Sequence, residues 1–280
     1  MEIIESPEKV REASRSFRRA GRSVGLVPTM GYLHAGHVSL VRAAREAAGA
    51  VIVTIFVNPI QFGPNEDFER YPRNMERDAA LCREAGADVI FAPDVRSMYP
   101  EGFQTKVTVG EVAGPLCGAS RPGHFDGVAT VVAKLFNVTE ADVAFFGEKD
   151  FQQLLVIRRM VRDLDMGVKV VGMPIVREPD GLAMSSRNVY LSPGERARAL
   201  SLSRSLKRAE SLFASGVRGA GPILDAVASE LGAAGLSPEY AEIRDAETLG
   251  PVSEITRPAV LAIAARVGGT RLIDNTVLGR

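Results

Sequence analysis

Short runs of β-branched residues alternate with longer segments of helical periodicity from the N-terminus to about residue 175. The runs have the length of buried strands, and apolar residues in the intervening segments recur every three or four positions. Alternation of this kind predicts a mainly parallel sheet covered by helices on both faces. The expected strands are residues 24–27, 51–57, 89–92, 143–146 and 168–171, and the expected helices are residues 38–48, 75–85, 128–136 and 151–164.

Three residues mark the ends of these expected helices. Asn74 and Asp150 each precede a periodic segment, where an N-cap side chain would accept a backbone N–H. Gly86 directly follows another periodic segment and suits the left-handed position that ends many helices.

The pattern changes after residue 176. A polar loop with the turn pair Asp180-Gly181 comes first. A helix is expected at residues 193–214, capped by Ser192 and begun by Pro193. A second helix near 222–231 and strands at 240–244, 260–267 and 271–274 follow, with a hairpin turn at residues 268–269. We therefore predict an α/β fold, with a Rossmann-like parallel-sheet domain over residues 1–176 and a smaller C-terminal α+β domain over residues 177–280.

The composition of the chain excludes several classes of protein and of binding partner. Lys+Arg and Asp+Glu both number 34, so no overall basic charge favours a nucleic acid, and we expect none as a partner. The apolar runs are far shorter than the roughly 20 residues of a membrane-spanning helix, and no signal peptide is evident. Cys82 and Cys117 have neither metal-site spacing nor the pattern of a disulfide framework. We expect a soluble cytoplasmic protein.

The segment VPTMGYLHAGH, residues 27–37, leads from the first expected strand into a helix. Ligands of open parallel sheets bind at such strand ends, and the free N–H groups of a helix N-terminus attract anions. Gly31 and Gly36 allow the backbone to approach a ligand closely. His34 and His37 are three residues apart, so both side chains can reach one phosphate and stabilise its charge. The segment therefore predicts a phosphate site.

Other interpretations of the two histidines are weaker. They could be polar surface residues, but two of the three histidines in the chain stand together here beside glycines. A zinc site would need further ligands nearby, and none is evident. The Walker, dinucleotide-binding, nucleophile-elbow and H-E-x-x-H motifs are all absent, which leaves this turn as the phosphate site by elimination.

The H-A-G-H pattern resembles the HIGH motif of the superfamily that includes class I aminoacyl-tRNA synthetases and small nucleotidylyltransferases. Members carry a second phosphate-binding loop rich in Lys and Ser, and residues 183–187, A-M-S-S-R, are similar to it. Arg187 stands in the place of the last basic residue. Hydroxyl groups and a guanidinium suit the β- and γ-phosphates of ATP. Taken alone, the segment could equally be an ordinary interdomain loop.

Five motifs in order narrow the resemblance to the pantoate–β-alanine ligases, also called pantothenate synthetases. They are VPTMG at residues 27–31, FVNPIQF at 56–62, RPGHF at 121–125, FGEKDFQQ at 146–153 and SSRN at 185–188. The resemblance extends to LIDN at residues 272–275, so it covers nearly the whole chain. It implies an enzyme of pantothenate and coenzyme A biosynthesis that condenses pantoate with β-alanine through a pantoyl adenylate, releasing pyrophosphate and AMP. It also implies Mg²⁺ with the ATP and a homodimer.

The resemblance assigns catalytic roles to His37, as the acid, and to His34 and Lys149. A lysine at a helix start is unusual, since cations are disfavoured there. Asp150 would accept a bond from a ribose hydroxyl. Gln61 and Gln153 match the pantoate-binding glutamines. The implied ATP contacts are Met30, Gly31, Tyr32, Leu33, His34, Ala35, Gly36, His37, Gly147, Glu148, Lys149, Asp150, Val176, Met184, Ser185, Ser186 and Arg187.

Other residues have weaker assignments. Asn58, Tyr71, Arg121 and His124 match positions near the pocket of the family, and we expect supporting roles for them. No protein ligand of Mg²⁺ is assigned. Asp78 is considered as one, although an acid on a helix face is more often simply solvated.

Two alternatives to the ligase remain. A nucleotidylyltransferase of the same superfamily would use the same histidine turn, but the Gln61 and Gln153 pair counts against it. A non-catalytic nucleotide-binding module would be expected to have lost part of the set formed by the two histidines, Lys149 and residues 185–187, and this set is intact.

Overall fold

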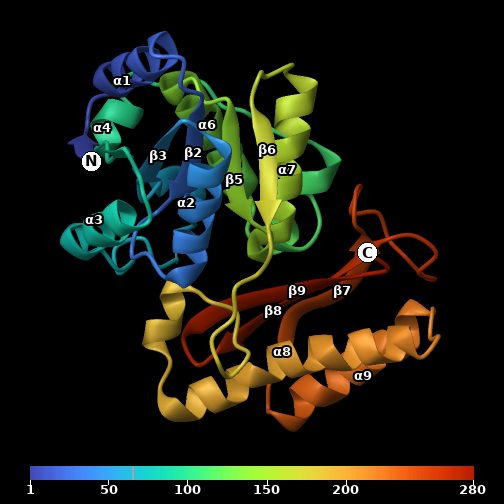
Figure 1. The fold of residues 1–280 in the computed structure, drawn as a ribbon. Helices are drawn as coiled ribbons and strands as arrows, with labels where there is room; N and C mark the ends of the chain where they lie inside the picture. Colours follow the sequence, from blue (N-terminus) through green and yellow to red (C-terminus); the bar gives the residue numbers. More distant parts are fainter. Residues whose placement is uncertain (65) are drawn as a thin grey trace. The chain divides into compact units, whose positions relative to one another are not determined.

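The computed structural model describes residues 1–64 and 66–280, which divide into two compact units (Figure 1). Each unit has a hydrophobic core of its own. Unit 1 comprises Met1–Ala113, Arg121–Glu148 and Gln153–Pro174, and unit 2 comprises Gly114–Ser120, Lys149–Gln152 and Ile175–Arg280. Two short segments from the N-terminal part of the chain thus pack with unit 2. The domain boundary after residue 176 remains a prediction.

Unit 1 is built on a six-stranded sheet in the order β1–β4–β3–β2–β5–β6, and every pair of neighbours is parallel. All five expected strands are present, which confirms the α/β prediction. The strand β1 was not expected, because its three residues are too few to show a pattern. The strands are β1 Glu2–Ile4, β2 Val24–Thr29, β3 Ala50–Ile55, β4 Val89–Phe91, β5 Val143–Gly147 and β6 Lys169–Met173.

Helices lie on both faces of this sheet. The helices α1 and α6 form one group, in which they contact each other and both contact β2. The helices α2 and α3 form a second group, in which α2 lies over β2 and β5 (Figure 1). The longer helices of unit 1 are α1 Pro7–Arg19, α2 Ala35–Ala47, α3 Met75–Glu84, α6 His124–Thr139 and α7 Phe151–Asp163, whose first two residues belong to unit 2. The sequence did not predict α1, or the one-turn helix α4 (Val95–Met98).

The helix ends agree with the sequence in two of three places. The Asn74 side chain accepts the N–H of Arg77 at 3.0 Å, and Gly86 has φ +91° after α3. Asp150 does precede α7, but it is the last residue of a 3-10 turn, η3 (Glu148–Asp150), that leads directly into the helix. The chain is therefore already helical where an extended capping residue was expected.

One hydrophobic cluster of unit 1 lies between the central strands and the helices α2 and α3. Parallel strands covered on both faces are apolar along most of their length, as β2 and β3 are here. The residues of this cluster include Val27, Val51, Val53, Ile90 and Phe145 from the strands, and Leu40, Val41, Ala44, Ala79 and Cys82 from the helices.

Unit 2 contains an antiparallel sheet in the order β7–β8–β9, packed against two helices (Figure 1). The Ser192 hydroxyl and the Glu195 carboxylate form the capping box that starts the first helix, with Pro193 in its first turn, as the sequence predicts. Val267 pairs with Thr270 across the expected two-residue hairpin. The elements are α8 Pro193–Ala214, α9 Ala220–Ala233, β7 Pro238–Asp245, β8 Ala259–Val267 and β9 Thr270–Leu278. The smaller α+β prediction is confirmed.

The structure describes the state of the two cysteines and the apolar character of the helices. Cys82 and Cys117 are both free and buried, and burial raises the pKa of Cys82 to about 12. In the part of the chain that the structure describes, no helix has both the length and the apolar character needed to cross a membrane.

Candidate active site

The turn that carries the two histidines begins where β2 ends. The Thr29 hydroxyl donates to the backbone oxygen of Thr54 at 2.6 Å and accepts the N–H of Gly31 at 3.2 Å. Gly31 then has φ +87° and Tyr32 has φ +50°. Two successive left-handed residues reverse the chain, so that the helix α2 starts a few residues after the strand ends.

Asp78 on α3 holds this turn in place. Its two carboxylate oxygens accept the backbone N–H groups of Tyr32 and Leu33, each at 2.7 Å. Asp78 is only 1% exposed, so it is not the solvated acid that is commoner on a helix face. Burial raises the pKa of the Asp78 carboxyl, against the opposing effect of the two N–H bonds. The carboxylate therefore fixes the left-handed turn just ahead of the histidines.

His34 and His37 form a reciprocal capping box at the start of α2. Nδ1 of His34 accepts the N–H of Gly36 at 3.2 Å, and Nδ1 of His37 accepts the N–H of His34 at 3.3 Å. The ring centroids are 4.1 Å apart. Because Nδ1 of each ring is an acceptor, the proton of each neutral imidazole lies on Nε2. Both rings are thus oriented by backbone groups, with Nε2–H as the donor.

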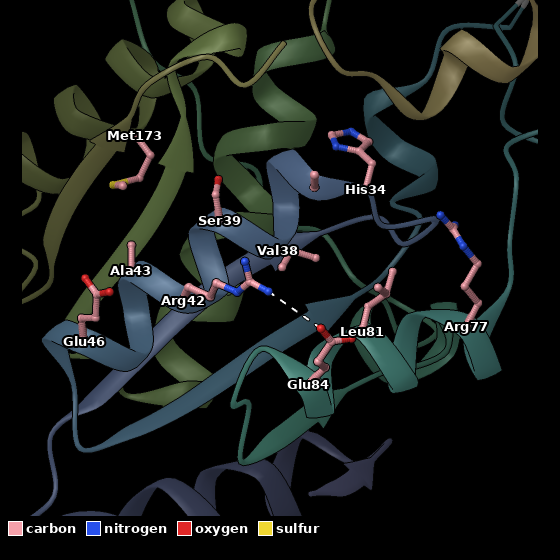
Figure 2. Close-up of a pocket in the computed structure, with 11 residues that line it drawn as sticks. His34, Val38, Ser39, Arg42, Ala43, Glu46, Arg77, Leu81, Glu84 and Met173 are labelled. Carbon is pink, nitrogen blue, oxygen red and sulfur yellow. Dashed lines mark ion pairs between the residues drawn. The ribbon is translucent and has the colours of Figure 1, made fainter. Parts of the chain in front are cut away.

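A hollow of about 470 Å³ lies beside His34 (Figure 2). Its lining comes from α2, from α3 and from Met173 at the end of β6. Arg42 on α2 and Glu84 on α3 form an ion pair of 3.9 Å within it. The volume is within the range of small-molecule sites, and the hollow reaches the helix end where an anion is favoured.

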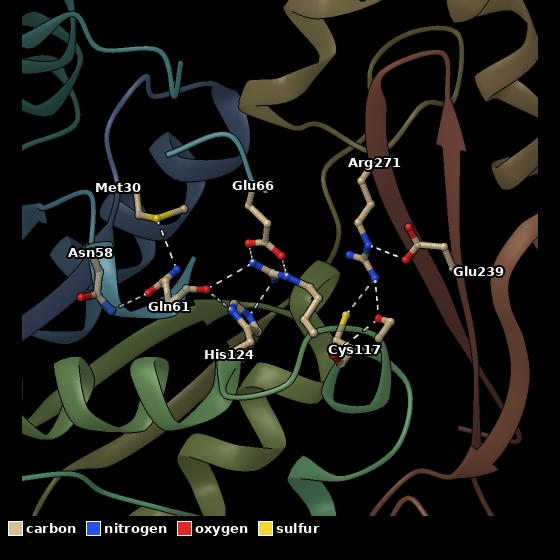
Figure 3. Close-up of polar contacts among 10 residues, drawn as sticks. Met30, Asn58, Gln61, Glu66, Cys117, His124, Glu239 and Arg271 are labelled. Carbon is tan, nitrogen blue, oxygen red and sulfur yellow. Dashed lines mark hydrogen bonds and ion pairs between the residues drawn. The ribbon is translucent and has the colours of Figure 1, made fainter. Parts of the chain in front are cut away.

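Gln61 lies in unit 1 next to the histidine turn. It ends a short 3-10 helix, η1 (Pro59–Gln61), and its side-chain amide donates to Sδ of Met30 at 3.4 Å (Figure 3). Its Oε1 accepts from Nδ2 of Asn58 at 2.9 Å. Asn58 is 1% exposed and accepts from the Tyr99 hydroxyl at 2.8 Å. The expected pantoate-binding amide is therefore oriented by a buried asparagine.

In unit 2, Lys149 is anchored to the last strand. Its backbone oxygen accepts from Nδ2 of Asn275 on β9 at 2.9 Å, and its Nζ lies 3.8 Å from the Asp150 carboxylate. The neighbouring Asp274 is 2% exposed and forms two bonds with Arg177, of 2.7 and 3.0 Å. The side chain of Lys149 is about 20% exposed, so its charge is close to the surface of the unit.

The serine–arginine segment follows a narrow hairpin. The N–H of Met184 donates to the oxygen of Val176 at 3.0 Å, and Gly181 turns the chain with φ +95°. The Ser185 hydroxyl then accepts the N–H of Arg187 at 3.2 Å and caps a 3-10 helix, η4 (Ser186–Tyr190). The segment is therefore an ordered turn, with two serines and one arginine side by side in the sequence.

The expected site residues divide between the two units, and their roles remain predictions. Unit 1 holds residues 30–37, Gly147 and Glu148, together with Gln61 and with Gln153 in the first turn of α7. Unit 2 holds Lys149, Asp150, Val176 and residues 184–187. Within unit 1 the structure brings the histidine turn and Gln61 together through Met30.

Sequence reasoning missed the residues that orient these groups. Asp78 bonds backbone groups 45 and 46 residues away, and no sequence pattern reveals a partner at that separation. Asn275 and Asp274 belong to LIDN, the last motif of the resemblance, and this motif was the one sign in the sequence that these residues matter. Nothing in that motif indicated that Asn275 bonds the backbone of Lys149.

Comparison with known families agrees with this arrangement. The family model described as pantoate-beta-alanine ligase matches residues 2–277. The chain belongs to the pantoate–β-alanine ligase family. Pantothenate synthetase of Geobacter sulfurreducens is 58% identical over 280 residues, covering 100% of this chain and 99% of the relative. Pantothenate synthetase of Thermotoga neapolitana is 55% identical over 280 residues, covering 100% of both chains.

Solved structures of the same family share the fold. The crystal structure of pantothenate synthetase from Thermus thermophilus matches with a TM-score of 0.95 and 48% identity over 100% of both chains. Pantoate-beta-alanine ligase from Francisella tularensis, complexed with beta-gamma ATP and beta-alanine, matches with a TM-score of 0.83 and 32% identity. That match covers 99% of this chain and 97% of that one.

In the part of this pantoate–β-alanine ligase that the structure describes, no group of three or more His, Cys, Asp or Glu side chains forms a protein site for Mg²⁺. Asp78, the acid considered for this role, already uses both oxygens on backbone N–H groups. The arrangement suits an ion that is held by triphosphate oxygens and water.

Gly31→Ala is expected to destabilise this ligase more than Gly21→Ala. Both glycines are left-handed, with φ +87° and +72°, so alanine strains both backbones by about 1–2 kcal/mol. A Cβ on Gly31 would also lie 3.0 Å from Cγ2 of Ile55 and 3.1 Å from Oδ2 of Asp78, whereas Gly21 has open space. We expect a further loss of about 1–3 kcal/mol for Gly31→Ala in urea unfolding. Equal losses would mean that the turn is not tightly packed.

Proposed function

We propose that this chain condenses pantoate with β-alanine by way of an enzyme-bound pantoyl adenylate. A pantoate carboxylate oxygen attacks the α-phosphorus of ATP, and pyrophosphate leaves. The amine of β-alanine then attacks the acyl carbon, and AMP leaves with the oxygen that bridged carbon and phosphorus. The observation that carries the proposal is the histidine pair at the start of α2, with both Nδ1 atoms bonded to backbone N–H groups, in a chain of this family.

The histidine turn is proposed to bind the ATP phosphates. The Nε2–H groups of His34 and His37 are donors that suit a phosphate, and the positive end of the α2 dipole favours its negative charge. His37 lies in the first turn of the helix, and we assign it the main stabilisation of charge that develops during the attack. His34, as the capping residue, has mainly a positioning role. Neither imidazole has to move, because backbone bonds already orient both rings.

The cationic groups of unit 2 are proposed to bind the departing pyrophosphate. Lys149 supplies a compact positive charge, and Arg187 supplies a planar set of donors that matches phosphate oxygens. The hydroxyls of Ser185 and Ser186 add neutral donors. Asp150 is proposed to accept from the ribose, and the backbone at Gly147 and Val176 to contact the nucleoside. Mg²⁺ bound to the triphosphate would neutralise part of its charge.

Gln61 and Gln153 are proposed to bind pantoate. An amide both donates and accepts, which suits a substrate with hydroxyl and carboxylate groups. The carboxylate of pantoate is itself the nucleophile, so no side chain has to form a covalent bond. The contribution of the protein is the positioning of two substrates and the stabilisation of charge. We further propose that the protein is cytoplasmic, and that it forms a homodimer, as the resemblance to the family implied.

Separate measurement of pyrophosphate and AMP tests the reaction. With ATP and pantoate alone, the protein should release pyrophosphate in an amount close to that of enzyme, and no AMP. Adding β-alanine should then release AMP and allow turnover. A nucleotidylyltransferase would instead release pyrophosphate with a phosphate or alcohol acceptor and show no requirement for pantoate. A nucleotide-binding module without activity would bind ATP and release no pyrophosphate with either substrate.

Gln153→Ala is expected to raise KM for pantoate roughly tenfold or more while KM for ATP changes little. The reason is the loss of a hydrogen bond to a charged or strongly polar substrate group. Gln104→Ala is the matched control, because Gln104 is exposed and lies outside the expected site. Steady-state kinetics with each substrate varied in turn gives both constants. Equal increases for pantoate and ATP would show that Gln153 has a structural role.

A further inference from the structure

The backbone oxygen of Gln61 is contacted by two side chains, one from the first residue of α6 and one from the turn that precedes the helix. Nδ1 of His124 lies 2.8 Å from this oxygen, and Nη2 of Arg121 lies 3.4 Å from it (Figure 3). Both residues belong to unit 1, as Gln61 does. The segment that carries the proposed pantoate amide is thus held through its main chain as well as through Asn58.

The partners of His124 define its protonation state. A carbonyl oxygen only accepts, so Nδ1 must carry a proton to bond Gln61. A guanidinium only donates, and Nη1 of Arg121 lies 3.0 Å from Nε2 of His124, so Nε2 must be an acceptor. The ring is therefore neutral with its proton on Nδ1. This tautomer is opposite to that of His34 and His37.

Arg121 is itself fixed by a carboxylate. Its Nε and Nη2 atoms each lie 2.6 Å from an oxygen of Glu66, in a paired geometry that orients the whole guanidinium plane. Its remaining nitrogen, Nη1, therefore has a defined direction toward the histidine ring (Figure 3). Glu66, Arg121 and His124 form a chain of bonds that ends on the Gln61 main chain.

Close packing ties this chain of bonds to the position of Gln61. α6 approaches η1 so closely at Gly127 that a Cβ there would lie 2.7 Å from Cα of Gln61 and overlap the oxygen of Ile60. Nδ2 of Asn58 also donates to the oxygen of Gly127 at 3.1 Å. A small displacement of the first turn of α6 would therefore be transmitted to Gln61.

We propose that neutral His124 is a positioning residue that holds Gln61 for pantoate, and that protonation of its Nε2 weakens this hold. The proposal rests on the pantoate-binding role proposed above for Gln61. Protonation removes the acceptor of Arg121 Nη1 and places a second cation 3.0 Å from a guanidinium. The pair can then no longer keep its present geometry, so Arg121 or the His124 ring must shift, and both side chains bond the Gln61 main chain.

The other charged groups around His124 do not replace its hold on Gln61. Glu66, from the segment after η1, is paired with Arg121, and its charge also attracts a protonated His124 ring. On α6 itself, Asp126 is paired with Lys106 at 2.6 Å. The residues of η1 are Pro59, Ile60 and Gln61, none of which titrates.

Two variants of His124 and a pH series test the proposal. His124→Ala should raise KM for pantoate roughly tenfold at pH ~8, with KM for ATP nearly unchanged. His124→Asn places an amide N–H close to the position of Nδ1 and cannot become charged, so it should raise KM for pantoate less than alanine does. In the unaltered protein, KM for pantoate should rise as the pH falls through the range in which histidines titrate. In His124→Asn this rise should be absent.

The pH dependence of kcat separates the effect of His124 protonation on KM for pantoate from the effects of protonating His34 and His37. It should remain in His124→Asn, because the other two histidines are unaltered. A KM for pantoate that rises at low pH as steeply in His124→Asn as in the unaltered protein would overturn the proposal. So would an unchanged KM for pantoate in His124→Ala.

A measurement without substrates tests the same geometry. Nitrogen-15 NMR of the imidazole rings should show the Nδ1–H tautomer for one histidine, assigned to His124 by its loss in His124→Asn, and the Nε2–H tautomer for the other two. An Nε2–H ring at His124 would overturn the inference even if pantoate turnover were normal. If turnover with pantoate fails while the Nδ1–H tautomer is found, the fault lies in the proposed function.

Discussion

Replacing His37 by alanine is expected to slow pantoate-dependent pyrophosphate release by roughly 10²-fold or more. The side chain supplies an Nε2–H donor whose direction is set by the bond from the His34 N–H to Nδ1. Removing a preoriented donor from a site of developing charge costs about 2.7–4 kcal/mol in comparable enzymes. A rapid-quench assay of the first turnover with ATP and pantoate measures the step directly.

His37→Asn separates the donor from the helix cap. The Asn Oδ1 can take the place of Nδ1 and accept the N–H of His34, which preserves the capping box at the start of α2. It offers no group at the position of Nε2. We expect this variant to unfold at a temperature close to that of the unaltered protein and to be nearly as slow as His37→Ala. A normal rate in His37→Asn would show that the residue is needed only as part of the cap.

Replacing Lys149 by alanine is expected to lower the same rate by roughly 10²-fold, with KM for pantoate nearly unchanged. The ammonium group is the proposed partner of charge that accumulates on the leaving pyrophosphate, and a charged donor contributes more than a neutral one. Its backbone is anchored by Asn275, so the substitution should not disturb the fold of unit 2. Rapid-quench measurement at saturating ATP gives the rate of the chemical step.

Lys169→Ala is the matched control for Lys149→Ala. Lys169 is an exposed lysine on β6, and its removal changes the net charge by the same amount. We expect it to have no measurable effect on either half-reaction. Lys149→Arg should recover only part of the lost rate, because a guanidinium is larger and planar where a compact charge is expected. Equal rates for Lys149→Ala and Lys169→Ala would contradict the assigned role.

Local patterns predicted much of the fold, because each prediction depended on neighbours in the chain. The strands at residues 143–146 and 168–171, the cap at Asn74 and the start of α8 at Pro193 agree with the structure to within a few residues. β1 was missed because its three residues gain their stability from pairing with β4, which is distant in the sequence. A contact of that kind has no signature in a short window of sequence.

In the candidate site, too, the contacts between side chains and distant parts of the chain could not be predicted from local sequence patterns. The spacing of His34 and His37 predicted two rings on one face, and they do lie together, but the spacing did not predict that each ring would cap the helix. Asp78 was considered as a ligand of Mg²⁺, with a solvated acid as the commoner alternative for an acid on a helix face. The structure instead buries that carboxylate beneath the histidine turn.

We propose that pantoate is activated through its carboxylate as an adenylate, and the fate of the carboxylate oxygen distinguishes this route from others. Pantoate labelled with oxygen-18 in the carboxylate is turned over with ATP and β-alanine, and the phosphate-containing products are analysed by mass spectrometry. An adenylate passes one labelled oxygen to AMP, so AMP should be heavier by one oxygen-18 while pyrophosphate stays unlabelled. Labelled inorganic phosphate formed together with ADP would show activation at the γ-phosphate instead and would contradict the account.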